Sequence, residues 1–176
     1  MKPVLKTLVS ALLCAFFVVS TAIHATAIDI QEVVSKQGIK SLLVEDYTLP
    51  IIALSFSFKG GSTQDKAGKE GTIRLMTALM DEGAGDMDSA TYRAKLEEFG
   101  IELGFSSSQD RFGGGMRTIV SEKENAFRLL KLALTEPRFD DVATERLRAG
   151  LLKSIRRSQT NPSYVSRKML RELLFA

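Results

Sequence analysis

The spacing of apolar residues is the feature that most constrains this fold. Runs with a period of two, typical of strands, are followed by runs with spacings of three and four, typical of helices, and the chain then repeats this order. Glycine and proline separate the runs. The expected strands are 31–35, 39–44, 51–58, 101–107 and 112–120, and the expected helices are 72–82, 88–99, 121–136, one from 140 and one from 161. This order predicts an α+β domain, an antiparallel sheet with helices packed on one face.

The first 27 residues have the pattern of a secretory signal peptide. Lys2 and Lys6 are followed by an apolar run at 8–19 and by small residues up to Ala27, and the segment contains no acid. The apolar run is shorter than the about 20 residues that a membrane-spanning helix needs, so a membrane anchor is the less favoured alternative. We therefore expect residues 1–27 to be removed, residues 28–176 to form the domain, and the protein to be periplasmic or secreted.

Cleavage after Ala27 would leave a chain without Cys14 and His24, the only cysteine and the only histidine. Disulfides, a cysteine nucleophile, a Ser-His-Asp triad and a zinc site built from His or Cys are then excluded. The remaining 22 basic and 21 acidic residues nearly balance, so no charge pattern favours nucleic acid.

The last expected helix ends in three apolar residues and an alanine, 173–176, without a cap or a polar tail. Either this end docks into a core, or the sequence is cut short. We favour a domain truncated at its C-terminus.

Two further motifs have competing interpretations. Gly113, Gly114 and Gly115 lack the Lys-Ser/Thr ending of a phosphate-binding loop, which favours a strand opened by glycines for a close neighbour. An acidic cluster could hold calcium, but its spacing misses the calcium-loop pattern, so a solvated turn is favoured. The cluster consists of Asp81, Glu82, Asp86 and Asp88.

Several short strings, in this order and spacing, resemble the amino-terminal domain of the insulinase/pitrilysin (inverzincin) family of zinc peptidases, which includes the mitochondrial processing peptidase. The resemblance covers roughly residues 30 to 170. The strings are Val44-Glu45-Asp46, Leu49-Pro50, Gly60-Gly61-Ser62, Gly71, Glu102 to Ser107, Pro137-Arg138-Phe139, Ile155-Arg156-Arg157 and Asn161-Pro162.

In this family a helix carries the zinc motif H-x-x-E-H, and a glutamate on a later helix is the third ligand. The resemblance places the three motif positions at Arg74, Thr77 and Ala78, and the third ligand at Ser154. An arginine, an alanine and two neutral hydroxyls supply neither zinc ligands nor a general base. We therefore expect no catalytic residue, no metal and no cofactor in this chain.

Arg74 has two interpretations: one residue of a helix face beside an empty site, which we favour, or a group that binds a carboxylate of a substrate or partner. The resemblance also implies that the strand at 103–108 lies at the cleft, where an extended peptide adds a strand through backbone hydrogen bonds. Its candidate substrate-binding residues are Gly104, Phe105, Ser106 and Ser107. The alternative is an ordinary edge strand kept soluble by serines.

Family members commonly work in pairs in which one subunit carries the zinc motif and the other is degenerate. The resemblance thus implies a non-catalytic subunit that shapes the chamber and binds extended peptide while a partner with H-x-x-E-H cleaves. Zinc is then expected only in that partner. The alternatives are a stand-alone periplasmic peptide-binding or scaffold domain, or a fragment without a function of its own.

Overall fold

The computed structural model describes residues 29–175, so the expected signal segment at 1–27 lies outside the described residues. The chain divides into two compact units, residues 1–48 and residues 49–176. In the first unit, β1 (Ile30–Val34) and β2 (Lys40–Val44) match two of the expected strands and form an antiparallel hairpin. Gly38 lies in its turn with φ 83°, a conformation that glycine adopts at little cost.

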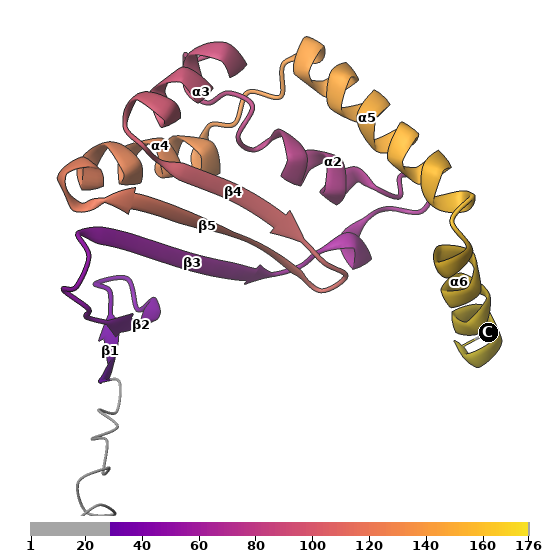
Figure 1. The fold of residues 1–176 in the computed structure, drawn as a ribbon, viewed down its shortest axis with the longest axis horizontal. Coiled ribbons are helices and arrows are strands. Elements are labelled where there is room, and N and C mark those ends of the chain that lie inside the picture. The colour runs from indigo at the N-terminus through magenta and orange to yellow at the C-terminus, as the bar shows by residue number, and fades with distance from the viewer. Residues whose placement is uncertain (1–28, 176) are drawn as a thin grey trace, which may run out of the picture. The chain divides into compact units, whose positions relative to one another are not determined.

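The second unit is built on an antiparallel sheet of β3 (Ile51–Lys59), β4 (Glu102–Ser107) and β5 (Arg111–Ile119), in the order β3-β5-β4. β5 is the central strand, and β4 pairs with it from Glu102 opposite Arg117 to Ser107 opposite Phe112. Figure 1 shows β4 and β5 as a hairpin with β3 beside β5.

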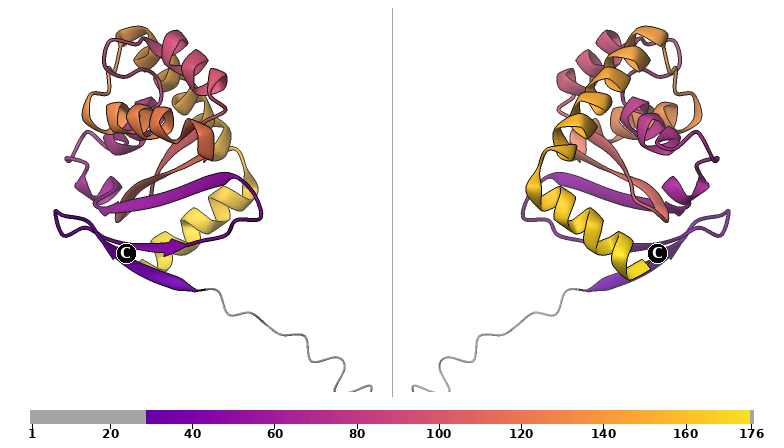
Figure 2. Two further views of the ribbon diagram at one scale, coloured as in Figure 1. Left: turned by 90° about the vertical axis from the view of Figure 1, so that its left-hand side faces the viewer. Right: turned by 90° about the vertical axis from the view of Figure 1, so that its right-hand side faces the viewer.

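The helices of this unit are α2 (Thr72–Leu79), α3 (Ser89–Glu98), α4 (Lys123–Thr135), α5 (Asp141–Gln159) and α6 (Pro162–Phe175). α2, α3 and α4 pack on one face of the sheet, and α5 packs against α2 (Figures 1 and 2). Two short 3₁₀ helices complete the unit, η1 (Ser62–Gln64) in the predicted loop and η2 (Val120–Glu122). The predicted α+β class, with an antiparallel sheet and helices on one face, is confirmed.

The core lies between the sheet and α3 and α4. Tyr92 and Leu129 are fully buried, and the Tyr92 hydroxyl donates a hydrogen bond to the carbonyl oxygen of Leu129 at 2.9 Å. Met116 brings the central strand into the same cluster. The period-two pattern of β3 has the expected result, because Leu54 and Phe56 face this cluster while the serines between them are exposed.

Two boundaries differ from the prediction. The helix expected from residue 121 begins only at Lys123, because Val120–Glu122 folds first into a 3₁₀ turn. α2 ends at Leu79 rather than at residue 82, since the chain turns there into the left-handed conformation of Gly83, φ 127°. Within residues 29–175, no helix combines the length and the apolar character that crossing a membrane requires.

Candidate functional site

α2 carries three of the four positions that the resemblance assigns to the zinc site. Asp65 fixes the start of this helix, because its carboxylate accepts the backbone N–H groups of Gly71 at 2.8 Å and Ile73 at 2.9 Å. The helix then packs against both β4 and α5, so the elements that carry Arg74 and Ser154 are neighbours (Figure 1).

The side chains at these positions offer no metal chemistry. Thr77 is buried, and its hydroxyl donates to the carbonyl oxygen of Ile73 at 2.7 Å, so it is committed to the helix backbone. Ala78 has no donor atom. Ser154 is exposed on α5, where its carbonyl oxygen accepts the Ser158 hydroxyl at 3.0 Å. Among residues 29–175, no cluster of three or more His, Cys, Asp or Glu side chains could hold a metal ion.

Arg74 is exposed and lines a groove of about 340 Å³ between α2 and α5. Across the groove lie residues of α5 that surround the position of Ser154, namely Leu151, Leu152 and Ile155. The structure therefore places Arg74 beside the α5 segment that would supply the third ligand, although Ser154 itself does not line the groove.

The candidate substrate-binding residues all lie on β4, which is an edge strand of the described sheet. The backbone N–H of Ser108 donates to the carbonyl oxygen of Arg111 at 2.8 Å at the hairpin end. Since such pairs alternate in an antiparallel ladder, Gly104 and Ser106 bond to β5. The N–H and C=O groups of Phe105 and Ser107 consequently point away from β5, toward the open edge.

The side chains of β4 divide between the two faces of the sheet. Phe105 is half-buried, and its ring lies 6.3 Å from that of Phe56 and 6.1 Å from that of Phe112, centroid to centroid. Its side chain is therefore used in packing, so only its backbone can meet a ligand at the edge. Gly104 and Ser106 are exposed on the opposite face.

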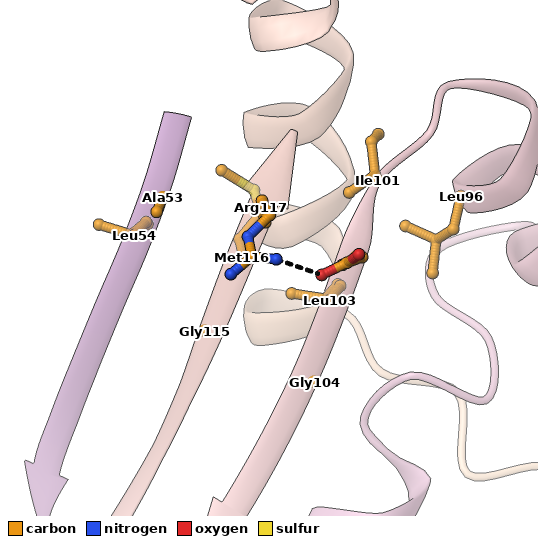
Figure 3. Close-up of a pocket in the computed structure, with 10 residues that line it drawn as sticks. Ala53, Leu54, Leu96, Ile101, Leu103, Gly104, Gly115, Met116 and Arg117 are labelled. Atoms are coloured by element: carbon orange, nitrogen blue, oxygen red, sulfur yellow. Dashed lines mark ion pairs between the residues drawn. The ribbon is translucent and has the colours of Figure 1, made fainter. Parts of the chain in front are cut away.

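Few large side chains cover the exposed face of the sheet around Gly104 and Ser106. A shallow depression of about 660 Å³ is lined by Gly104 and Gly115 and by the Glu102–Arg117 ion pair, whose atoms are 3.5 Å apart (Figure 3). Ile101, directly before β4, and Leu96, beyond β4 on the side away from β5, complete its lining. Because Gly104 and Gly115 carry no side chains, this part of the exposed face of the sheet is uncrowded.

One polar cluster around Glu82 is not predictable from the sequence pattern. Glu82 was expected in a solvated turn, but its side chain is only 2% exposed. One carboxylate oxygen accepts Arg93 of α3 at 2.8 Å, and the other accepts Ser89 of α3 and Arg146 of α5. Calcium is therefore not needed to explain this glutamate, because two guanidinium groups already neutralise it. Arg146 lies 64 residues farther along the chain, too far for sequence spacing to reveal the pair.

No family model matches the chain, but individual proteins do. A solved structure from Pseudomonas fluorescens, described as a peptidase M16 inactive domain, superposes with a TM-score of 0.74 at 24% sequence identity, over 82% of this chain and 35% of its own. The chain has the fold of a peptidase M16 domain. A second structure, a protease from Helicobacter pylori, has a TM-score of 0.66 at 17% identity, over 79% of this chain and 34% of its own.

Among curated proteins, the chain is similar to the non-peptidase homolog YmxG of Helicobacter pylori. The two are 22% identical over 171 residues, which is 97% of this chain and 38% of that protein. The resemblance to a degenerate insulinase-like domain is confirmed by these likenesses. They also agree with the expectation that the chain is not a peptidase on its own. The chain spans little more than a third of the length of the proteins it matches.

Proposed function

We propose that this protein is the non-catalytic subunit of an exported zinc metallopeptidase complex. It shapes part of the chamber and holds extended peptide substrate, while a partner that carries H-x-x-E-H cleaves the peptide. Residues 1–27 direct its export to the periplasm or beyond. Zinc belongs to the partner, because this chain has neither ligands nor a base at the motif positions.

The observation that carries the proposal is the edge strand β4 beside α2, a helix whose side chains at positions 74, 77 and 78 cannot ligate a metal. Outward-pointing backbone groups of Phe105 and Ser107 can pair with an added strand, and the neighbouring small side chains do not obstruct it. Backbone pairing depends on geometry rather than on particular side chains. The capacity to hold a peptide can therefore persist in a chain that has lost the capacity to cut it.

Cleavage, by contrast, needs particular chemical groups, which backbone geometry cannot supply. A zinc peptidase uses the metal to polarise the peptide carbonyl and to generate a nucleophilic water at neutral pH. Thr77 stands where the general base would be, and its hydroxyl is already bonded to the helix backbone. A division of labour between two subunits agrees with these residues, as does the likeness to proteins described as inactive or non-peptidase.

The proposal is tested by purifying the tagged full-length protein from its own host and identifying what accompanies it by mass spectrometry. We expect a related protein that retains H-x-x-E-H. The reconstituted pair should cleave peptides, the chain alone should not, and removal of zinc should abolish the activity of the pair.

A different result would favour the second function considered for this sequence. If the chain is recovered alone or only with peptides, and mixing it with exported family members never changes their activity, the subunit assignment is wrong. A stand-alone peptide-binding or scaffold domain would then be the better description.

A further inference from the structure

The groove between α2 and α5 combines positive charge with an apolar lining. Arg74 and Lys69 contribute cations from the α2 side, and Arg148 contributes one from α5. Leu75 and Leu151, together with Leu152 and Ile155, form the apolar part of the lining. Leu152 and Ile155 remain 45% and 42% exposed, so the groove is accessible to a ligand.

Arg74 is the guanidinium in this groove that is available to a ligand. Arg148 forms an ion pair with Glu145, with 3.4 Å between Nη1 of the arginine and Oε1 of the glutamate. Glu70 also lines the groove, but one of its carboxylate oxygens accepts the backbone N–H of Gly68 at 2.9 Å. Within the described residues, Arg74 forms no ion pair.

The charge of the surrounding segment reinforces this site. Residues 141–176, which include α5 and α6, contain eight basic and three acidic residues. A positively charged surface raises the local concentration of anionic ligands and disfavours cationic ones. The field around the groove therefore favours a carboxylate.

A peptide bound along β4 would run beside α2, the helix that begins at Thr72 and carries Arg74. α2 packs against β4 and α5 at once, so a strand added at the β4 edge runs beside the helix that carries the guanidinium. A guanidinium offers a planar fork of N–H donors that matches a carboxylate, and charge-assisted bonds of this kind are stronger than neutral ones. Nearby aliphatic groups exclude water and strengthen the attraction.

We propose that the Arg74 groove binds a side-chain carboxylate of the extended peptide, so that this chain selects peptides carrying aspartate or glutamate. This inference rests on the proposed function, because it needs the peptide to lie along β4. Arg74, at the first position of the lost zinc motif, then supplies a fixed positive charge near the place where catalytic relatives hold a metal ion.

The test uses fluorescently labelled peptides as long as β4, six residues, with alternating threonine and valine and an amidated C-terminus. Two glutamate peptides are made, each with glutamate at a different one of the two central positions. Both are needed because adjacent side chains of a strand point to opposite faces. Each is compared with its glutamine counterpart, which has the same shape without the charge. Binding to the purified full chain is measured by fluorescence anisotropy.

We expect one of the two glutamate peptides to bind about tenfold more tightly than its glutamine counterpart, a difference of about 1.4 kcal/mol. Arg74→Ala should abolish this preference, so that the glutamate peptide and its glutamine counterpart bind equally. Arg74→Glu should reverse the preference, so that a lysine peptide binds more tightly than the glutamate peptide. Arg128→Ala, an exposed arginine on α4, is the matched control and should change nothing.

Circular dichroism melts of all variants exclude unfolding as the cause. Equal binding of glutamate and glutamine peptides by the unsubstituted chain would overturn the groove assignment and leave peptide binding along β4 intact. A preference that survives Arg74→Ala would also overturn it. If no peptide binds at all, the proposed function fails and this inference fails with it.

Discussion

Glu82 shows how a single buried charge connects elements that are distant in the sequence. Its carboxylate follows α2 and joins Ser89 and Arg93 of α3 to Arg146 of α5. The arginines are about half exposed, 53% and 54%, while the glutamate is 2% exposed. The cost of burying this charge is offset only while its partners stay in place.

We predict that Glu82→Gln lowers the free energy of unfolding by about 1–3 kcal/mol, since the buried site loses its charge-assisted hydrogen bonds. The penalty stays within this range because both arginines can turn to water. Glu98→Gln is the matched control, because Glu98 is 55% exposed in its pair with Lys95, and it should cost at most about 1 kcal/mol. Urea unfolding of the two variants measures the difference, and equal effects would show that the network contributes no more than a surface pair.

Asp88 is predicted to make stability depend on pH in the acid range. It caps α3, and the N–H of Thr91, which donates to its carboxylate at 2.8 Å, lowers the pKa of Asp88 below the usual 3.8. A lowered pKa in the folded state stabilises the fold above the pKa of the unfolded chain, and this contribution is lost as the pH falls through the folded value.

Asp88→Asn keeps a capping oxygen but does not titrate. The stability advantage of the unsubstituted chain over Asp88→Asn should therefore be present near neutral pH and absent well below pH 3.8. Urea unfolding at the two pH values measures it. An advantage that is independent of pH would mean that the charge of Asp88 does not contribute.

The sequence predicts the strands and helices well because most of their determinants are local. α3 lies within the expected range 88–99, since Asp88 caps its start and Gly100 follows its end with φ 60°. α4 starts later than expected for a reason that residue identity does not reveal: the backbone enters a 3₁₀ turn before the helix starts. The Glu82 cluster could not be predicted from local sequence, because Arg146 of α5 is brought near Glu82 only by the tertiary fold.

The prediction that the glycines of β5 admit a close neighbour holds at Gly113 but not at Gly115. A Cβ at Gly113 would lie 2.5 Å from the carbonyl oxygen of Phe56, a backbone atom that cannot move without disturbing β3. A Cβ at Gly115 would lie 3.4 Å from its nearest neighbour, the carbonyl oxygen of Leu54. Two glycines on one strand therefore have different tolerance for a methyl group.

We predict that Gly113→Ala destabilises the chain by about 1–3 kcal/mol, as overpacking in a rigid environment does. Gly115→Ala should change stability by no more than about 0.5 kcal/mol. Thermal unfolding of both variants, followed by circular dichroism, provides the comparison. If the two substitutions cost the same, close contact with Phe56 is not what requires glycine at position 113.

The whole domain combines the fold of a peptidase M16 domain with motif positions that offer no zinc chemistry. Most of the chain superposes on an M16 domain with a TM-score of 0.74, and α2 packs against α5. The positions that would hold zinc carry an arginine, a threonine, an alanine and a serine. The absence of zinc ligands could be predicted directly from the sequence, because residue identity alone shows that no imidazole stands at these positions. The groove at Arg74 could not be read in the same way, since its walls come from helices about 75 residues apart.

The central claim is that this chain holds an extended peptide along the edge of β4, and N-methylated peptides test it most directly. In a strand added to that edge, every second N–H faces β4 and the others face away. Two six-residue peptides, as long as β4, are compared: one is methylated on odd-numbered nitrogens and the other on even-numbered nitrogens. We expect one pattern to abolish binding to the full chain and the other to leave it nearly unchanged. Equal binding of the two methylated peptides, whether weakened or not, would contradict strand addition at the edge of β4.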